Sequence, residues 1–119
     1  KEDQGTRLEY RALDPACNPY LAFSVLLAAG LAGIRHGYEL PGETTVNLFE
    51  SGADAPADLG RRLPANLAEA LDAMERSELV REALGEHIFE WFLRNKRAEW
   101  GAYRTHVSSF ELNRYLRTW

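Results

Sequence analysis

The sequence predicts a mostly α-helical chain with one strand near its N-terminus. Three patterns lead to this fold class. An apolar run extends from Tyr20 to Ile34, apolar residues recur at spacings of three and four after Pro64, and polar and apolar residues alternate over positions 6–11. A chain of 119 residues with 45% hydrophobic content holds at most one domain and is not compositionally disordered.

The predicted strand lies within residues 1–13. Alternation over positions 6–11 places charged side chains on one face of the strand and apolar ones on the other. The charged residues are Arg7, Glu9 and Arg11, and the apolar ones are Leu8 and Tyr10. The pair Asp14-Pro15 then interrupts the pattern, so we expect the strand to end before it.

A buried helix is predicted over residues 18–35. Asn18 suits the N-cap and Pro19 the first helical position. The run from Tyr20 to Ile34 is apolar on every side, and such a helix is buried in a large core or spans a membrane. Because a span needs about 20 apolar residues and this run is shorter, we predict a core helix and no membrane segment. The rest of the chain is too small to cover it, which indicates a missing partner.

The remainder divides into a loop and a helical region. Residues 37–64 are rich in turn formers and form a predicted variable surface loop. Residues 65–119 form the predicted helical C-terminal region, with helices at about 66–74, 77–85 and 86–104. Ser77 is the expected cap of the second helix, and the Ser108 to Glu111 capping box should open a last one.

Composition limits the class of protein and its partners. A net charge of −4 and a pI near 5.4 give no basic footprint for nucleic acid. The single cysteine, Cys17, excludes an internal disulfide framework and fits a reducing compartment. Residues 1–5 lack the apolar core of a secretory signal, so we predict a cytoplasmic location. The chain begins at Lys1 rather than Met, and we expect it to be a piece of a longer protein.

The charged face of the predicted strand is the candidate site. Guanidinium groups of Arg7 and Arg11 can bind phosphate or carboxylate, and the carboxylate of Glu9 can bind Mg²⁺ or Mn²⁺. The alternative is a solvent-facing strand with alternating charges. A metal site from Glu86, His87 and Glu90 competes with a solvated helix face, which the sequence favours. The cluster Arg94, Lys96 and Arg97 is also predicted to be a solvated helix face.

An ordered series of motifs resembles the C-terminal part of the catalytic domain of bacterial type I glutamine synthetases. The series runs R-x-E-x-R, D-P, N-P-Y and A-G-L-x-G-I, ending at Ile34. Residues 78–87, 95–100 and 110–116 resemble an actinobacterial branch of that family. The resemblance implies a fragment of an α+β ligase, whose residues 1–13 contain the active-site strand.

The resemblance also implies roles for the three charged residues. Glu9 would bind one of two catalytic Mg²⁺ or Mn²⁺ ions, Arg7 the nucleotide phosphates, and Arg11 the substrate glutamate. ATP would phosphorylate the γ-carboxylate of glutamate, and ammonia would displace phosphate from the resulting γ-glutamyl phosphate. The full-length enzyme would serve glutamine biosynthesis as a double-ring homo-oligomer, expected to be a dodecamer, although the sequence leaves the ring size open.

Two departures from the family pattern qualify this interpretation. Phe49 follows Asn47-Leu48, where many bacterial members have a tyrosine that is adenylylated, so that form of regulation is not expected. The other metal ligands and the nucleotide pocket belong to upstream sequence, so the fragment alone should be inactive. Two alternatives stay open: a related ligase that joins glutamate to another amine, and a non-catalytic helical interaction module.

Overall fold

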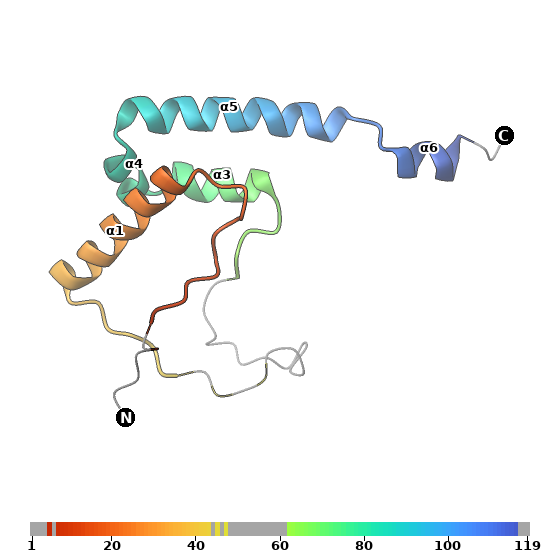
Figure 1. Ribbon diagram of the computed structural model, residues 1–119. Coiled ribbons are helices and arrows are strands. Elements are labelled where there is room, and N and C mark those ends of the chain that lie inside the picture. Colours follow the sequence, from red (N-terminus) through yellow and green to blue (C-terminus); the bar gives the residue numbers. More distant parts are fainter. Residues whose placement is uncertain (1–4, 6, 44, 46, 48–61, 117–119) are drawn as a thin grey trace. The chain divides into compact units, whose positions relative to one another are not determined.

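The computed structural model describes residues 5, 7–43, 45, 47 and 62–116. Within this part the chain forms five α-helices, labelled in Figure 1: α1 (Pro19–His36), α3 (Leu67–Glu75), α4 (Glu78–Leu84), α5 (Glu86–Thr105) and α6 (Ser109–Tyr115). The chain divides into two compact units, residues 1–63 and 64–119.

Helix α1 begins and ends where its local sequence dictates. The Asn18 side chain accepts hydrogen bonds from the backbone N–H groups of Tyr20 and Leu21, at 3.0 and 3.4 Å, and Pro19 is the first helical residue. The predicted N-cap is therefore confirmed. At the other end, Gly37 has φ 60°, a left-handed conformation in which glycine carries no steric cost, and this terminates the helix.

The apolar side chains of α1 are exposed or half-buried. None of its residues is buried by the described part of the chain. The exposed large apolar side chains recur along one stripe of the helix at spacings of three and four: Tyr20, Phe23, Leu27, Leu31 and Ile34. The predicted burial of this helix thus requires a covering surface that the described residues do not supply, and it stays a prediction.

By length and composition, α1 could also cross a membrane. The helix has 18 residues and a mean hydropathy of 1.2. It is longer than the apolar run from which it was predicted. Core helices of soluble proteins share both properties. Helix length therefore does not separate the two environments here, and the prediction of a core helix has to rest on other grounds.

The predicted N-terminal strand is not formed in the described residues 7–13. The physical reason is that a strand is held by hydrogen bonds to a neighbouring strand, and an isolated strand is not stable in water. The described residues contain no second strand to pair with this one. The regular secondary structure of the described residues is accordingly all helical, and the α+β class is not confirmed.

Helices α3, α4 and α5 pack together around a small core. Figure 1 shows α5 lying along α3, with α4 joining their ends. Leu71 of α3 and Phe89 and Leu93 of α5 are buried, and the Phe89 side chain is fully enclosed. Half-buried apolar residues complete this core, namely Leu67, Met74, Val80, Leu84 and Phe92. Three helices from one continuous segment thus form the packed centre of residues 64–119.

Gly85 is the only residue between α4 and α5, and it has an unusual backbone conformation. It ends α4 and precedes α5 with φ 73° and ψ 153°, a region open almost exclusively to glycine. The space around it is empty, so a Cβ would meet no neighbouring atom within 4 Å. Any cost of a side chain here must therefore come from the backbone.

We predict that Gly85→Ala destabilises residues 64–119 by about 1–3 kcal/mol. The cost arises because alanine cannot occupy this conformation without strain. Urea unfolding followed by tryptophan fluorescence measures it. Gly101→Ala is the matched control, because Gly101 lies inside α5 with open space around it and alanine favours helix there. Equal stability of Gly85→Ala and the unsubstituted chain would show that the strain is absent.

Helix α6 opens with the predicted capping box. The backbone N–H of Glu111 donates to the Ser108 hydroxyl at 3.2 Å, and the Ser108 N–H donates to the Glu111 carboxylate at 2.7 Å. The Ser108 hydroxyl also donates to the Glu111 carboxylate at 2.8 Å. The two hydrogen bonds that Ser108 donates lower the pKa of Glu111, with a smaller contribution from His106. The box is therefore strongest when Glu111 is ionised.

We predict that α6 frays on acidification. Because the pKa of Glu111 is lower in the folded chain than in the unfolded one, its contribution is present above the unfolded pKa. It is lost as pH falls from the ordinary glutamate pKa through the lowered folded pKa. The Ser108 amide resonance in NMR should shift over this window in the unsubstituted chain. It should not titrate in Glu111→Gln, which keeps an acceptor oxygen but carries no proton equilibrium.

Candidate functional site

The three predicted site residues lie on the N-terminal segment. Arg11 Nη2 and Glu9 Oε1 form an ion pair at 2.7 Å. Their side chains are 82% and 51% exposed, and Arg7 is exposed as well. The structure therefore brings Glu9 and Arg11 together, and Arg7 forms no ion pair with Glu9 in the described part of the chain. An ion pair this exposed is worth at most about 1 kcal/mol, so Glu9 and Arg11 can separate to bind a ligand.

The donor set of this segment fits one ligand of a hard cation and part of an anion site. A carboxylate oxygen of Glu9 is suited to Mg²⁺ or Mn²⁺, and Mg²⁺ commonly takes only one or two carboxylates together with phosphate oxygens. The two guanidinium groups suit phosphate or carboxylate. Among the described residues no group of three histidine, cysteine, aspartate or glutamate side chains could hold a metal ion. Further ligands would have to come from elsewhere.

A hydrogen-bonded turn joins this segment to α1. The Asp14 carboxylate accepts from the Ala16 N–H at 2.7 Å, and the Asp14 carbonyl accepts from the Cys17 N–H at 3.0 Å. Asn18 follows directly and caps α1. The sequence marked this stretch only as a break in the strand pattern, although Asp before Pro is a recognisable turn signal. The turn thus fixes the end of the segment next to Arg11.

Glu86 and Glu90 are engaged by an arginine. Arg81 Nη1 lies 2.6 Å from Glu86 and 3.2 Å from Glu90, and its guanidinium stacks on the Phe89 ring at 4.2 Å from the centroid. The hydrogen bond to Glu86 is the largest cause of a raised pKa for Arg81. His87 lies against Trp91, with ring centroids 6.1 Å apart. The contacts of Arg81 with Glu86, Glu90 and Phe89 link α4 to α5.

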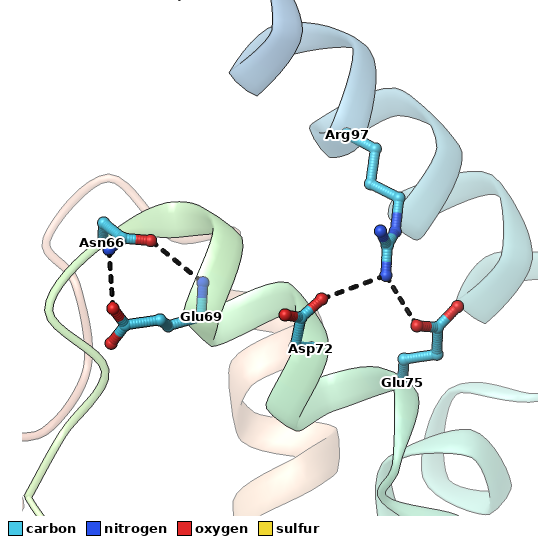
Figure 2. Close-up of polar contacts among 5 residues, drawn as sticks. All are labelled: Asn66, Glu69, Asp72, Glu75 and Arg97. Atoms are coloured by element: carbon cyan, nitrogen blue, oxygen red, sulfur yellow. Dashed lines mark hydrogen bonds and ion pairs between the residues drawn. The ribbon is translucent and has the colours of Figure 1, made fainter. Parts of the chain in front are cut away.

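Arg97 is exposed, as predicted for a solvated helix face, and it also has charged partners on another helix, which were not predicted from the sequence. Figure 2 shows Arg97 reaching from α5 to two carboxylates of α3, Glu75 at 2.6 Å and Asp72 at 3.3 Å. Asp72 and Glu75 are one helical turn apart and so present both carboxylates on the same face. That spacing of two carboxylates was the sequence signal from which a basic partner could have been predicted. Arg94 also has a partner, because its guanidinium lies 3.7 Å from the Trp91 ring centroid.

Helix α3, like α6, begins with an N-cap residue that is hydrogen-bonded to a glutamate three residues later. Figure 2 shows Asn66 and Glu69 linked in both directions: the Glu69 N–H donates to Asn66 Oδ1 at 3.0 Å, and Asn66 Nδ2 donates to Glu69 Oε1 at 2.8 Å. The N-cap of α3 is thus a local feature of residues 64–119. It offers a matched control for substitutions at the turn before α1.

Comparison with known proteins places these features in a family context. The family model described as glutamine synthetase, catalytic domain, matches residues 1–115. A glutamine synthetase of Mycolicibacterium smegmatis is 53% identical over 111 residues, which cover 92% of this chain and 25% of that protein. One from Mycobacterium tuberculosis is 54% identical over the same length and shares. One from Methanosarcina mazei is 51% identical over 114 residues, covering 94% of this chain and 25% of the relative.

A solved structure described as apo GmaS without ligand is also similar. Its TM-score is 0.74 and its sequence identity is 32%, over 87% of this chain and 24% of that one. The chain therefore spans about a quarter of the length of the proteins that it matches. The match to the glutamine synthetase family model includes the segment with Arg7, Glu9 and Arg11, since it begins at residue 1 of this chain.

Proposed function

This chain belongs to the glutamine synthetase catalytic-domain family, and from this we propose that it is the C-terminal part of an ATP-dependent ligase that joins ammonia to glutamate. The observation that carries the proposal is the family match over residues 1–115, which includes the whole Arg7, Glu9 and Arg11 segment. Mycobacterial relatives at 53–54% identity support the actinobacterial-like branch.

In this proposal each charged residue has one task. Glu9 provides a carboxylate ligand to one of two divalent cations, Mg²⁺ or Mn²⁺, which supply positive charge next to the transferring phosphoryl group when bound. Arg7 binds nucleotide phosphate and Arg11 binds the glutamate carboxylate. The γ-carboxylate of glutamate takes the phosphoryl group of ATP, and ammonia then displaces phosphate to form the amide. The exposed, weakly paired state of Glu9 and Arg11 supports such roles.

The fragment by itself is proposed to be inactive. It spans about a quarter of its relatives, and one carboxylate with two arginines cannot hold two cations, a nucleotide and glutamate. The rest of the longer protein would supply the missing ligands and a neighbouring strand for residues 6–11. It would also cover the exposed stripe of α1, which supports a core helix over a membrane span. We further propose a double-ring homo-oligomer in the cytoplasm.

Adenylylation is not part of the proposal. Phe49 has no hydroxyl group to modify, and it lies outside the described residues, so this point rests on the sequence alone. Incubation of the longer protein with an adenylylating enzyme and labelled ATP should leave it unlabelled. Phe49→Tyr is the matched variant that would accept the label if the alignment of this position holds.

The test is glutamate- and ammonia-dependent phosphate release from ATP in the presence of Mg²⁺. It is run on the 119-residue chain and on the longer protein that contains it. Phosphate release by the longer protein and none by the fragment supports the proposal. If the longer protein is silent with ammonia but active with another amine, the acceptor is wrong and the ligase class stands. Silence with every amine would favour a non-catalytic helical module.

A further inference from the structure

The turn at Asp14 is the only hydrogen-bonded structure between the candidate site and α1 in the described residues. The Asp14 carboxylate and carbonyl accept the N–H groups of Ala16 and Cys17 at 2.7 and 3.0 Å. Pro15 fixes its own backbone angle φ within this turn. The Asn18 cap then ties the same stretch to the first turn of α1. Residues 14–21 are thus held as one short rigid connection.

Arg11 lies just before this connection and has no secondary structure of its own. Residues 7–12 are neither helix nor strand. The turn is therefore the hydrogen-bonded point nearest to Arg11 on the α1 side, and it stays so when residues 6–11 pair with a neighbouring strand as proposed above. Three extended residues span about 10 Å, so a rotation of a few degrees at Asp14 moves Arg11 by an appreciable part of an ångström. Displacements of about 1 Å can cost about 100-fold in rate.

We propose that Asp14 is a positioning residue, whose carboxylate holds the turn that aims Arg11, and with it Glu9, at the substrate glutamate. This positioning role rests on the proposed function, because only the proposed function gives Arg11 a substrate to bind. Asp14 itself touches no substrate in this account. Its side chain accepts a backbone hydrogen bond, and that bond is what the reaction depends on.

The kinetic signature follows from this role. Loss of the turn should loosen glutamate binding more than it affects the chemical step, so Asp14→Ala should raise the KM for glutamate at least about tenfold, within the range that misplacement produces. The KM for ATP should change less, because Arg7 lies four residues further from the turn than Arg11. Asp14→Asn should restore the KM for glutamate, since an asparagine side chain forms the same turn.

The experiment uses the longer active protein with Asn66→Ala as the matched control. Asn66 caps α3 with the same kind of bond, a side-chain oxygen accepting a backbone N–H at 3.0 Å, but it lies in the other unit. Asn66→Ala should lower the thermal midpoint and leave both KM values unchanged. If Asp14→Ala does not accumulate, Asp14→Ser takes its place, because serine makes a weaker turn of the same kind and should give an intermediate KM.

The outcomes separate the two proposals. A raised glutamate KM in Asp14→Ala, restored in Asp14→Asn and absent in Asn66→Ala, supports the positioning role. An unchanged KM, or one that Asp14→Asn does not restore, overturns that role while the ligase stands. If the unsubstituted protein turns over no amine, the proposed function is wrong and the positioning role falls with it.

Discussion

Glu9→Ala in the longer protein is expected to reduce glutamate- and ammonia-dependent phosphate release by at least about 100-fold. Loss of a carboxylate that holds a catalytic cation removes several kcal/mol of charge stabilisation from phosphoryl transfer, and each 1.4 kcal/mol corresponds to about tenfold in rate. Loss of an outer-shell partner alone costs about 10–100-fold in metal affinity or activity, so a direct ligand should exceed that range. Steady-state phosphate release at saturating ATP measures the effect.

A measurement of thermal stability distinguishes the loss of a metal ligand from unfolding of the variant. Glu9 is half exposed and its ion pair with Arg11 is worth at most about 1 kcal/mol, so Glu9→Ala should leave the thermal midpoint almost unchanged. Glu39→Ala is the matched control, because Glu39 is an exposed glutamate in the same unit. A fully active Glu9→Ala variant would remove Glu9 from the metal site and leave its negative charge as a surface feature.

Phe89→Ala is expected to destabilise residues 64–119 by about 3–5 kcal/mol. Phe89 is 0% exposed and is the centre of a core in which, among the described residues, only Leu71 and Leu93 are also buried. Removing it leaves a cavity that three short helices cannot readily close. Since whole domains are stable by only about 5–15 kcal/mol, much of the stability of this small unit would be lost.

Tryptophan fluorescence during urea unfolding measures this change, because all three tryptophans of the chain lie after residue 64. Phe110→Ala is the matched control. Phe110 is 70% exposed on α6, so the same truncation there should change stability by about 0.5 kcal/mol or less. Equal effects of the two substitutions would show that Phe89 is not the centre of the packed core.

The features that the sequence predicted well are those with local causes. Asn18-Pro19 and the Ser108 to Glu111 box act within one helical turn, and the structure has both. The strand is not confirmed in the described residues 7–11 for the opposite reason, since its hydrogen bonds need a neighbouring strand that the described residues lack. The partners of Arg97 were missed because they are 22 and 25 residues away, beyond the reach of a periodic pattern.

In the candidate site, too, some features followed from the sequence and others only from the structure. Spacing and family resemblance singled out Arg7, Glu9 and Arg11; the family match covers these positions, and their roles stay a prediction. The Glu9–Arg11 ion pair and the turn at Asp14 became visible only in three dimensions. Neither follows from alternation, because a polar residue at a strand end looks the same whether it faces solvent or holds a turn.

The single glycine between α4 and α5 also fixes how the chain can change in length. With one residue shared by two helix ends, an insertion after Gly85 has no loop in which to be absorbed. Each added residue turns a helix by about 100° and advances it by about 1.5 Å. One inserted residue would therefore rotate Phe89 and Leu93 out of the core and bring polar side chains of α5 into it. Gene variants that lengthen this joint should be lost, whereas lengthening the chain between α5 and α6 should be tolerated.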